Sequence, residues 1–378
     1  MPRDKRLCAV REAEADPCPE WRGTVGLRVT RLSQACKTVV KSRMPFLVPL
    51  LRRGRSSLAD VRVRVARVLH GKPRLVHLEL TSKCNIACKA CYRSGPMREL
   101  MDTRTTMSPA DVEVLLHSYW SAEVMAFVLS GGENLLHPQF FTILEAIRKR
   151  FPSKPVTLST NGVLLSRDHA LLERVCSSSL DTIQFSLHGA RQRTVSLLQP
   201  GIVIPPMLDA MRYITESSAI DVGVNFVIQY ENVDEMVELI ELLANAGMHT
   251  LTVSFTPMNY AGHTEQSVDY DALWDEMGLR QKLSRTTARA SELGIRVATL
   301  DKLECYSVFS VDVLTASGAM LPCWGNYLVK RFALGNALHE KPRAIRKQPE
   351  LRDLQAALRR GEIPALCVAC WANGRYSL

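Results

Sequence analysis

The sequence has no apolar run that is long enough to cross a membrane. Its longest apolar run, Met44–Leu51, is interrupted by two prolines, whereas a spanning helix needs about 20 apolar residues in a row. The first twenty residues also lack the apolar core of a secretory signal peptide. These absences predict a cytoplasmic protein whose cysteines are reduced.

The cysteines lack the pattern of a disulfide framework. There are 11 of them in 378 residues, an odd number in a long chain. Small secreted domains instead carry an even set of closely spaced cysteines. Here three cysteines share one short segment and four more fall in the last quarter of the chain, so we expect metal or iron–sulfur ligation.

Internal repeats and low-complexity tracts are absent too. With 46% hydrophobic and 23% charged residues, the composition excludes a disordered, collagen-like or coiled-coil chain. A length of 378 residues corresponds to about two to three globular domains.

Positive charge is confined to the N-terminal part. Residues 1–75 hold 18 Lys and Arg against 6 Asp and Glu, a net charge of +12, so the total of +10 leaves −2 for residues 76–378. Enzymes of nucleic acids usually carry positive charge around the cleft, and we expect no nucleic acid partner. Residues 1–73 are predicted to form a basic, mainly helical extension. It either binds an anionic peptide or membrane surface or packs as a solvated collar.

Strands and helices alternate from residue 74 onward. Ser108 and Pro109 form an N-cap and a first-turn proline, and Asn232 with Glu235 predicts a second cap. The strands are predicted at 74–81, 123–130, 155–160, 182–187, 221–228 and 249–255, and the helices near 109–120, 138–150, 167–176, 232–247 and 269–293. Six such units predict an α/β fold, a partial (β/α)6 TIM-like barrel with its active site at the carboxyl ends of the strands.

The first cysteine group follows the first predicted strand directly. Cys84, Cys88 and Cys91 have C-x3-C-x2-C spacing, and soft thiolates suit iron–sulfur clusters or zinc. A structural zinc site needs a fourth ligand nearby, and none follows locally. Three thiolates therefore favour a [4Fe-4S] cluster with one open iron, although buried or zinc-bound cysteines are the alternative.

A Gly-Gly-Glu segment ends the second predicted strand. Gly131 and Gly132 let a ligand approach the backbone closely, and the carboxylate of Glu133 can bind an ammonium group. The segment alone is a weak signal. One unit after the cysteine group it becomes a strong one.

With these two motifs, residues 74–265 resemble the radical S-adenosylmethionine (radical SAM) superfamily. The resemblance implies that the three cysteines hold a [4Fe-4S] cluster and that SAM binds its open iron. It implies that Glu133 binds the amino group of SAM, with Gly131 and Gly132 alongside. Further SAM contacts would come from Ser159, Asn161 and Ser186, which match family positions, and from Pro257, which resembles an adenine-side position. The alternative for Ser159 and Asn161 is a plain turn after a strand.

The chain departs from the family pattern at two positions. Ala90 stands where a bulky residue is common, so Tyr92 is the candidate for that contact. His188 stands where the family commonly has an aspartate, and its pKa near 6.5 would suit proton transfer. His188 is therefore predicted to be a catalytic proton acceptor or substrate ligand. The alternative is a hydrogen-bonded turn histidine.

The second cysteine group lies near the end of the chain. Cys305 is separated by twelve residues from Gly318, and four more residues lead to Cys323, while Cys367 and Cys370 form a C-x2-C pair. Four thiolates can complete a second cluster, or a zinc ribbon. The pattern resembles the SPASM/twitch extension, which implies an auxiliary [4Fe-4S] cluster. We divide the chain into an extension (1–73), the barrel (74–265), a linker helix and strand (266–300) and this small C-terminal domain (301–378).

The resemblance implies a radical SAM oxidoreductase, similar to 2-deoxy-scyllo-inosamine dehydrogenases. A 5′-deoxyadenosyl radical would abstract a hydrogen atom from a small polyol, aminocyclitol or sugar-like substrate. Oxidation would follow, with the auxiliary cluster as electron acceptor, or epimerisation. A flavodoxin or ferredoxin would be the reductant. The alternatives are a maturase of ribosomally made peptides and a non-enzymatic metal-bound binding protein. Cys176, outside both groups, is either a hydrogen donor for epimerisation or a small core residue.

Overall fold

The computed structural model describes residues 75–91, 93, 106–119, 123–257, 276–299, 307–323, 332–364 and 367. The chain divides into two units, residues 1–69 and 70–378, and all described residues belong to the second. The predicted basic extension, 1–73, lies outside the described residues. None of the described helices has the length and apolar character that a membrane span requires.

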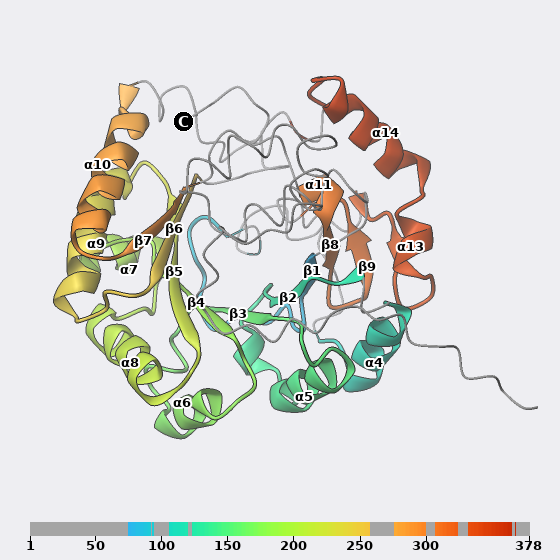
Figure 1. The fold of residues 1–378 in the computed structure, drawn as a ribbon, viewed down its shortest axis with the longest axis horizontal. Coiled ribbons are helices and arrows are strands. Elements are labelled where there is room, and N and C mark those ends of the chain that lie inside the picture. The colour runs from blue at the N-terminus through green and yellow to red at the C-terminus, as the bar shows by residue number, and fades with distance from the viewer. Residues whose placement is uncertain are drawn as a thin grey trace, which may run out of the picture. The chain divides into compact units, whose positions relative to one another are not determined.

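The described residues build one sheet of ten strands in the order β10-β9-β8-β1-β2-β3-β4-β5-β6-β7. Strands β1 to β7 pair in chain order, and each pair is parallel. They are Leu75–Leu78, Ala126–Leu129, Val156–Thr160, Thr182–Ser186, Asp221–Ile228, Thr252–Pro257 and Arg296–Thr299. Figure 1 shows this sheet curving as a partial barrel with helices on its outer side, which confirms the predicted α/β barrel class.

The sheet continues beyond the six predicted strands on both sides. Strand β7 lies in the segment predicted as a linker, and it pairs in parallel with β6. Strand β8 (Val311–Leu314) pairs in parallel with β1, and β9 (Ala319–Leu321) and β10 (Gly335–Asn336) follow antiparallel. The described start of the C-terminal region is therefore continuous with the barrel sheet.

Helices cover the outer face of the sheet. Those of the barrel are α4 (Pro109–Ser118), α5 (Phe140–Arg150), α6 (His169–Cys176), α7 (Gln192–Leu198), α8 (Ile204–Ser217), α9 (Met236–Asn245) and α10 (Leu279–Glu292). Helices α7 and α8 were not predicted. The prolines that start α8 occupy its first turn, where a backbone N–H is not needed.

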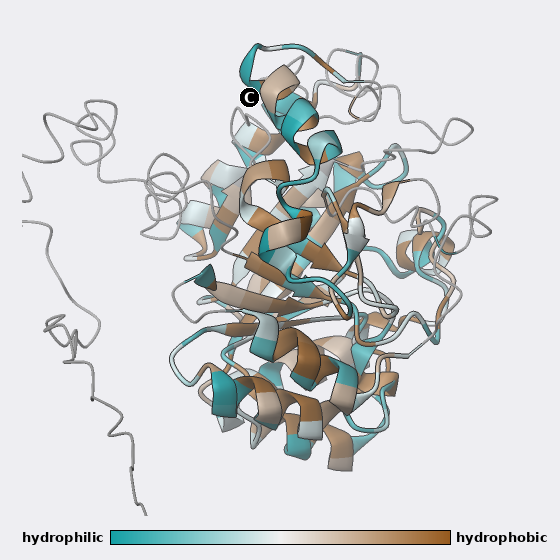
Figure 2. Ribbon diagram, turned by 90° about the vertical axis from the view of Figure 1, so that its right-hand side faces the viewer, coloured by the Kyte–Doolittle hydropathy of each residue, from teal (hydrophilic) through white to brown (hydrophobic). Residues whose placement is uncertain are grey.

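The two faces of the sheet differ in polarity. In β3, Val156 and Leu158 are fully buried, whereas Thr157 and Ser159 are half-buried. The parallel register places buried apolar residues side by side across the strands, as in the row Leu129, Leu158, Ile183 and Val222. Figure 2 shows that the helices carry hydrophobic and hydrophilic residues in alternation, as amphipathic helices do. The apolar core therefore lies between the sheet and its helices, and the inner face is left to polar residues.

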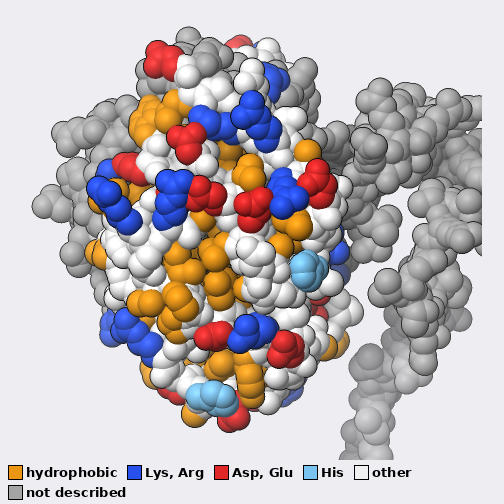
Figure 3. All heavy atoms as spheres, turned by 90° about the vertical axis from the view of Figure 1, so that its left-hand side faces the viewer, with side chains coloured by type: hydrophobic (Ala, Val, Ile, Leu, Met, Phe, Trp, Pro, Cys, Tyr) orange, Lys and Arg blue, Asp and Glu red, His pale blue; other side chains and the backbone are white. Residues whose placement is uncertain are grey.

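The outer surface over α9 and α10 carries charges of both signs. Figure 3 shows Lys and Arg next to Asp and Glu on this face. Arg289 of α10 pairs with Glu241 at 2.9 Å, and Lys282 pairs with Asp234 at 2.9 Å. This face has no large patch of one sign.

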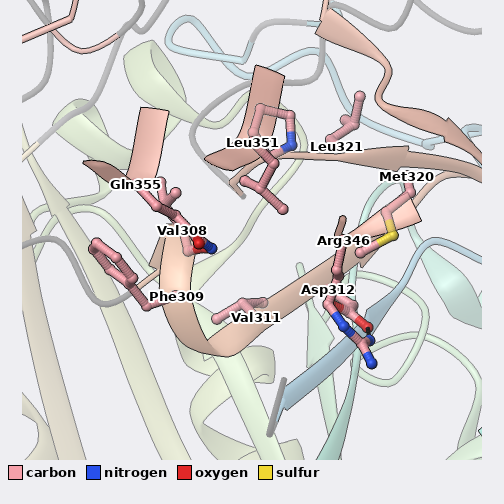
Figure 4. A pocket seen from close by; sticks show the side chains of 10 residues that line it. Val308, Phe309, Val311, Asp312, Met320, Leu321, Arg346, Leu351 and Gln355 are labelled. Atoms are coloured by element: carbon pink, nitrogen blue, oxygen red, sulfur yellow. Dashed lines mark hydrogen bonds and ion pairs between the residues drawn. The ribbon is translucent and has the colours of Figure 1, made fainter. Parts of the chain in front are cut away.

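The C-terminal helices α11 (Ser307–Ser310), α13 (Pro342–Ile345) and α14 (Pro349–Arg359) lie beside β8 and β9. Figure 4 shows the small pocket between them, with Asp312 and Arg346 close together. Asp312 pairs with Arg346 at 2.6 Å and accepts a hydrogen bond from the Tyr119 hydroxyl at 2.7 Å. This buried contact joins the C-terminal helices to α4 of the barrel.

Candidate functional site

The cysteine loop leaves the carboxyl end of β1, as predicted. Its backbone is held at both ends: the Lys83 N–H donates to Thr81 Oγ1 at 3.2 Å, and the Lys89 N–H donates to the Leu198 carbonyl at 2.9 Å. Lys89 also forms an ion pair with Glu231. Contacts from three parts of the chain therefore shape the loop that carries Cys84, Cys88 and Cys91.

The three thiols of this loop are close enough to oppose one another's ionisation. Burial, together with the neighbouring Cys91 and Cys84, raises the pKa of Cys88 to about 12. A bound cationic centre would relieve this repulsion. A [4Fe-4S] cluster binds soft thiolates, each to a different iron, so three neighbouring thiols are a donor set that fits a cluster.

The Gly-Gly-Glu turn packs directly on this loop. The Gly132 N–H donates to the Thr81 carbonyl at 3.0 Å, and the Glu133 N–H donates to the Lys83 carbonyl at 2.8 Å. A Cβ on Gly132 would lie 2.2 Å from the Lys83 oxygen. Gly131 has a φ of +138° and leaves room for Glu79. Glycine is therefore required at both positions for the loop and the turn to touch.

The Glu133 carboxylate is turned into the protein. It is 1% exposed and accepts hydrogen bonds from the Thr160 hydroxyl at 3.0 Å, the Asn161 N–H at 2.8 Å and the Leu135 N–H at 3.3 Å. Burial raises its pKa to about 7. This side chain therefore holds the ends of β2 and β3 together. A carboxylate has about four acceptor positions, and the contact of Glu133 with the amino group of SAM stays a prediction.

Asn161 has an engaged side chain as well. Its Nδ2 donates to Asn85 Oδ1 at 2.8 Å and to Cys84 Sγ at 3.7 Å, and its Oδ1 accepts from the Val163 N–H at 3.0 Å. Both amide hydrogens are used within the protein. The structure places Asn161 against the cysteine loop, and its contact with SAM stays a prediction.

The inner face of the sheet carries the other predicted serines. Ser159 and Ser186 are half-buried, and the parallel register sets Ser159 beside Gln184 and Ser186 beside Asn225. Along this face the strands contribute hydroxyl and amide side chains: Thr157, Ser159, Gln184, Ser186, Asn225 and Ser254.

His188 is a hydrogen-bonded turn residue. Its Nδ1 accepts from the Val227 N–H at 3.2 Å, its N–H donates to Gln199 Oε1 at 2.7 Å, and its carbonyl accepts from Asn232 Nδ2 at 3.0 Å. Burial lowers the pKa of the ring to about 4. A neutral ring with so low a pKa is a poor proton acceptor at neutral pH, so the geometry favours the turn alternative over a catalytic base.

Asn232 and Glu235 do not cap α9 as predicted. The Asn232 side chain accepts from the Gln229 N–H at 2.7 Å and donates to the carbonyls of His188 and Val227. Glu235 accepts from the Ala190 and Arg191 N–H groups at 2.8 and 3.1 Å, at the start of α7. The side chains of Asn232 and Glu235 therefore hold the loops after β4 and β5, because the backbone groups of these loops lie within hydrogen-bonding distance.

The sequence analysis missed His77 and Glu79 at the end of β1, and Arg93 after the cysteine loop. His77 and Glu79 are 4% and 1% exposed, and Glu79 forms an ion pair with Arg93, which also donates to the Ser82 carbonyl at 3.3 Å. This pair ties the two ends of the cysteine loop to β1. The alternation of apolar and polar residues in Val-His-Leu-Glu-Leu was the available signal.

Several predicted residues cannot be placed in the site. Tyr92, Cys305, Cys370 and the side chain of Pro257 lie outside the described residues. Cys323 and Cys367 are described and half-buried.

Cys176 ends α6 just before β4 begins. It therefore lies at the amino end of the strands, opposite the cysteine loop, and is a partly buried core residue rather than a hydrogen donor at the site.

Curated relatives match roughly half of the chain. It is 28% identical over 227 residues to pre-heme d1 synthase of Dinoroseobacter shibae, covering 60% of this chain and 53% of that protein. It is 23% identical over 185 residues to a probable GTP 3′,8-cyclase of Methanocaldococcus jannaschii, covering 49% and 60%. The chain thus spans about half the length of the curated relatives that it matches.

Solved structures match more of the fold. Streptococcus suis SuiB, bound to its precursor peptide SuiA, covers 91% of this chain and 88% of its own, with a TM-score of 0.65 and 16% identity. The structure titled native anSMEcpe with bound AdoMet covers 74% and 82%, with a TM-score of 0.58 and 15% identity. At these identities the likeness concerns the fold alone.

A family model supplies the assignment. The model described as the radical SAM superfamily matches residues 78–273, which is more than half of the chain. Its range includes the cysteine loop and the Gly-Gly-Glu turn that pack on each other. The chain therefore belongs to the radical SAM superfamily, whose members bind a [4Fe-4S] cluster and S-adenosylmethionine.

Proposed function

We propose that this protein is a radical SAM oxidoreductase that oxidises a small, hydroxyl-bearing molecule on the inner face of the barrel. Cys84, Cys88 and Cys91 would hold the cluster. When bound, the reduced cluster and SAM supply a 5′-deoxyadenosyl radical that takes a hydrogen atom from a substrate carbon.

The polar inner face is the observation that supports a hydroxyl-bearing substrate. Adjacent strands present Ser159, Gln184, Ser186 and Asn225 side by side, and these side chains can both donate and accept hydrogen bonds. An apolar substrate would leave such groups without partners, at a cost of about 1–3 kcal/mol each. A polyol, aminocyclitol or sugar satisfies them.

Some residues around the site would bind the ligands, and others position the loops that carry them. Gly131 and Gly132 let the backbone of the turn come close to the amino acid part of SAM. Glu133 and Asn161 hold the cysteine loop and the end of β3, and His188 orders the loops after β4 and β5. Ser159 and Ser186 lie on the inner face, where ligand oxygens can be bound.

We assign the C-terminal cysteines to an auxiliary cluster. Cys323 and Cys367, with Cys305 and Cys370, would supply four thiolates, and such a centre supplies an electron acceptor. Oxidation of a secondary alcohol then balances. The carbon gives one hydrogen atom to the deoxyadenosyl radical, the hydroxyl gives one proton to solvent, and the remaining electron leaves for the acceptor to yield a ketone.

A peptide substrate is the second candidate. The fold is similar to SuiB with its precursor peptide and to anSMEcpe, also solved with a peptide. The net charge of +12 in residues 1–75 suits an acidic leader segment. This candidate and the small-molecule proposal share the same radical chemistry and differ only in what occupies the barrel.

An anaerobic assay tests the proposal. The reconstituted protein is incubated with SAM, a reductant such as flavodoxin or dithionite, and panels of polyols, aminocyclitols and leader-bearing peptides. We expect 5′-deoxyadenosine together with a product that has lost two hydrogens from a polyol or aminocyclitol. Modification of peptides alone would overturn the substrate proposal. Absence of SAM cleavage under all conditions would favour a non-enzymatic binding protein.

Matched cysteine variants serve as controls. C84A, C88A and C91A are expected to lose the site iron and all 5′-deoxyadenosine formation. C176A removes a cysteine at the opposite end of the barrel and is expected to keep both. Full iron content in C84A would contradict the assigned ligands.

A further inference from the structure

Asn161 is tied to the cysteine loop through its side chain and to the Gly-Gly-Glu turn through its backbone. Its Nδ2 lies 3.7 Å from Cys84 Sγ and 2.8 Å from Asn85 Oδ1, and its N–H donates to a Glu133 oxygen at 2.8 Å. The residue is 7% exposed. Cys84 precedes Asn161 by 77 residues and Glu133 precedes it by 28 residues, so the cysteine loop and the Gly-Gly-Glu turn meet at Asn161.

The orientation of the amide is fixed by a third contact. Asn161 Oδ1 accepts the Val163 N–H at 3.0 Å, so the carbonyl side of the amide points toward its own chain. The NH2 side must then face the cysteine loop. With one hydrogen directed at Asn85, the other is directed at the Cys84 sulfur.

A hydrogen bond to a thiolate ligand changes the energy of the attached cluster. Reduction adds a negative charge, and an N–H directed at a ligand sulfur stabilises that charge. Hydrogen bonds to cluster sulfurs are one of the terms that set the reduction potential. Cys84 is exposed and Asn161 is 7% exposed, so this hydrogen bond is partly buried.

We propose that Asn161 is a positioning residue that raises the reduction potential of the site cluster through its hydrogen bond to Cys84. Glu133 supports it by holding its backbone N–H. The inference rests on the proposed role of Cys84 as a cluster ligand.

The test is an EPR-monitored redox titration of the reconstituted holoenzyme without SAM. N161D keeps the side-chain shape and an oxygen for the Val163 N–H, but it removes both amide donors and adds a negative charge, which itself lowers the midpoint. The neutral N161L, which also lacks the donors, is therefore measured beside it, and a shift in N161D that N161L does not share overturns the proposal. We expect N161D to retain its iron. At a fixed solution potential, its ratio of reduced to oxidised cluster should be at least about tenfold lower than that of the wild type. This is a midpoint at least about 59 mV more negative for a one-electron couple.

N85A is the matched control, because it removes the other acceptor of the same amide and leaves the bond to Cys84 intact. Its midpoint is expected to equal that of the wild type. A wild-type midpoint in N161D overturns the proposal. So does loss of iron from a folded N161D, because Asn161 would then shape the loop rather than set its potential. If N161D does not fold, N161L is judged by the same midpoint. Full iron content in C84A would instead refute the ligand role of Cys84.

Discussion

At the scale of single residues, the site depends on positions where the chain has no spare space. Gly132 touches the backbone of the cysteine loop, and an added Cβ would meet the carbonyl oxygens of Lys83 and Thr81 at 2.2 and 2.7 Å. Backbone atoms cannot move aside as the end of a flexible side chain can. The loop therefore has to shift for any residue larger than glycine.

We expect Gly132→Ala to lower the bound iron of the reconstituted protein severalfold, measured by iron analysis. Gly247→Ala is the control. Gly247, unlike Gly132, has a positive φ, +81°, and nothing lies within 4 Å of an added Cβ. Its substitution should cost about 1–2 kcal/mol of stability and leave the iron content unchanged. Equal iron content in both variants would show that the close contact is not needed.

Two histidines with lowered pKa values, His77 and His188, predict acid sensitivity. Burial lowers the pKa of His188 and of His77 from 6.5 to about 4. Between pH 4 and pH 6.5 the unfolded chain binds protons that the folded protein does not. The free energy of unfolding is therefore highest above pH 6.5 and decreases as the pH drops toward 4. Each histidine contributes up to about 3 kcal/mol to this loss.

His188→Asn should flatten this dependence. The asparagine Oδ1 can still accept the Val227 N–H, but the titrating ring is gone. Denaturant unfolding of the apoprotein at several pH values measures the effect, and His339→Asn, at an exposed position, is the control. A slope that His188→Asn leaves unchanged would contradict the buried, neutral state of the ring.

At the scale of elements, α7 is held by a carboxylate from another helical segment. Glu235 is 3% exposed, accepts two backbone N–H groups just before α7, and binds the Thr194 hydroxyl. A negative charge near a helix N-terminus also interacts favourably with its dipole. Helix α7 in turn leads to Gln199, which binds the backbone of His188.

We expect Glu235→Ala to lower the free energy of unfolding by about 1–3 kcal/mol, because it leaves buried donors without an acceptor. Glu238→Ala is the matched control. Glu238 also pairs with Arg191, but both side chains are largely exposed, and such pairs contribute about 0–1 kcal/mol. Chemical denaturation compares the two variants. Equal losses would show that burial does not distinguish them.

At the scale of the second structural unit, a buried charge joins the C-terminal helices to the barrel. Asp312 of β8 is 1% exposed, and it contacts Tyr119 of the residues following α4 and Arg346 after α13. Burial raises the pKa of Asp312 to about 6 even though Arg346 opposes the shift. Arg346 therefore stabilises the ionised form of the Asp312 carboxylate.

Arg346→Met is expected to destabilise the protein by about 3–5 kcal/mol, because it leaves a buried carboxylate without its partner. Arg360→Met, which removes an exposed pair with Glu362, should cost about 1 kcal/mol or less. Thermal and denaturant unfolding measure both. If Asp312→Asn in the Arg346→Met background recovers nothing, the uncompensated charge is not the cause of the loss.

The sequence by itself determined the family and the order of the barrel strands. The cysteine spacing, the Gly-Gly-Glu segment and the alternation of strands are local patterns, and local spacing fixes them before any tertiary contact forms. The sequence also predicted β5 at its observed bounds, Asp221–Ile228. It placed the cysteine loop after β1 and the glycine turn after β2, because strand and turn signals lie within a few residues of one another.

Only the tertiary structure decided what the side chains around these motifs do. Glu133, Asn161 and His188 were each predicted to be ligands or catalysts, and the structure shows that each also bonds groups far away in sequence. The pairing of β7 and β8 with the barrel sheet was settled in the same way. The physical reason is that a buried polar group must find a partner, and the strand register, not the local sequence, determines which partner lies within reach.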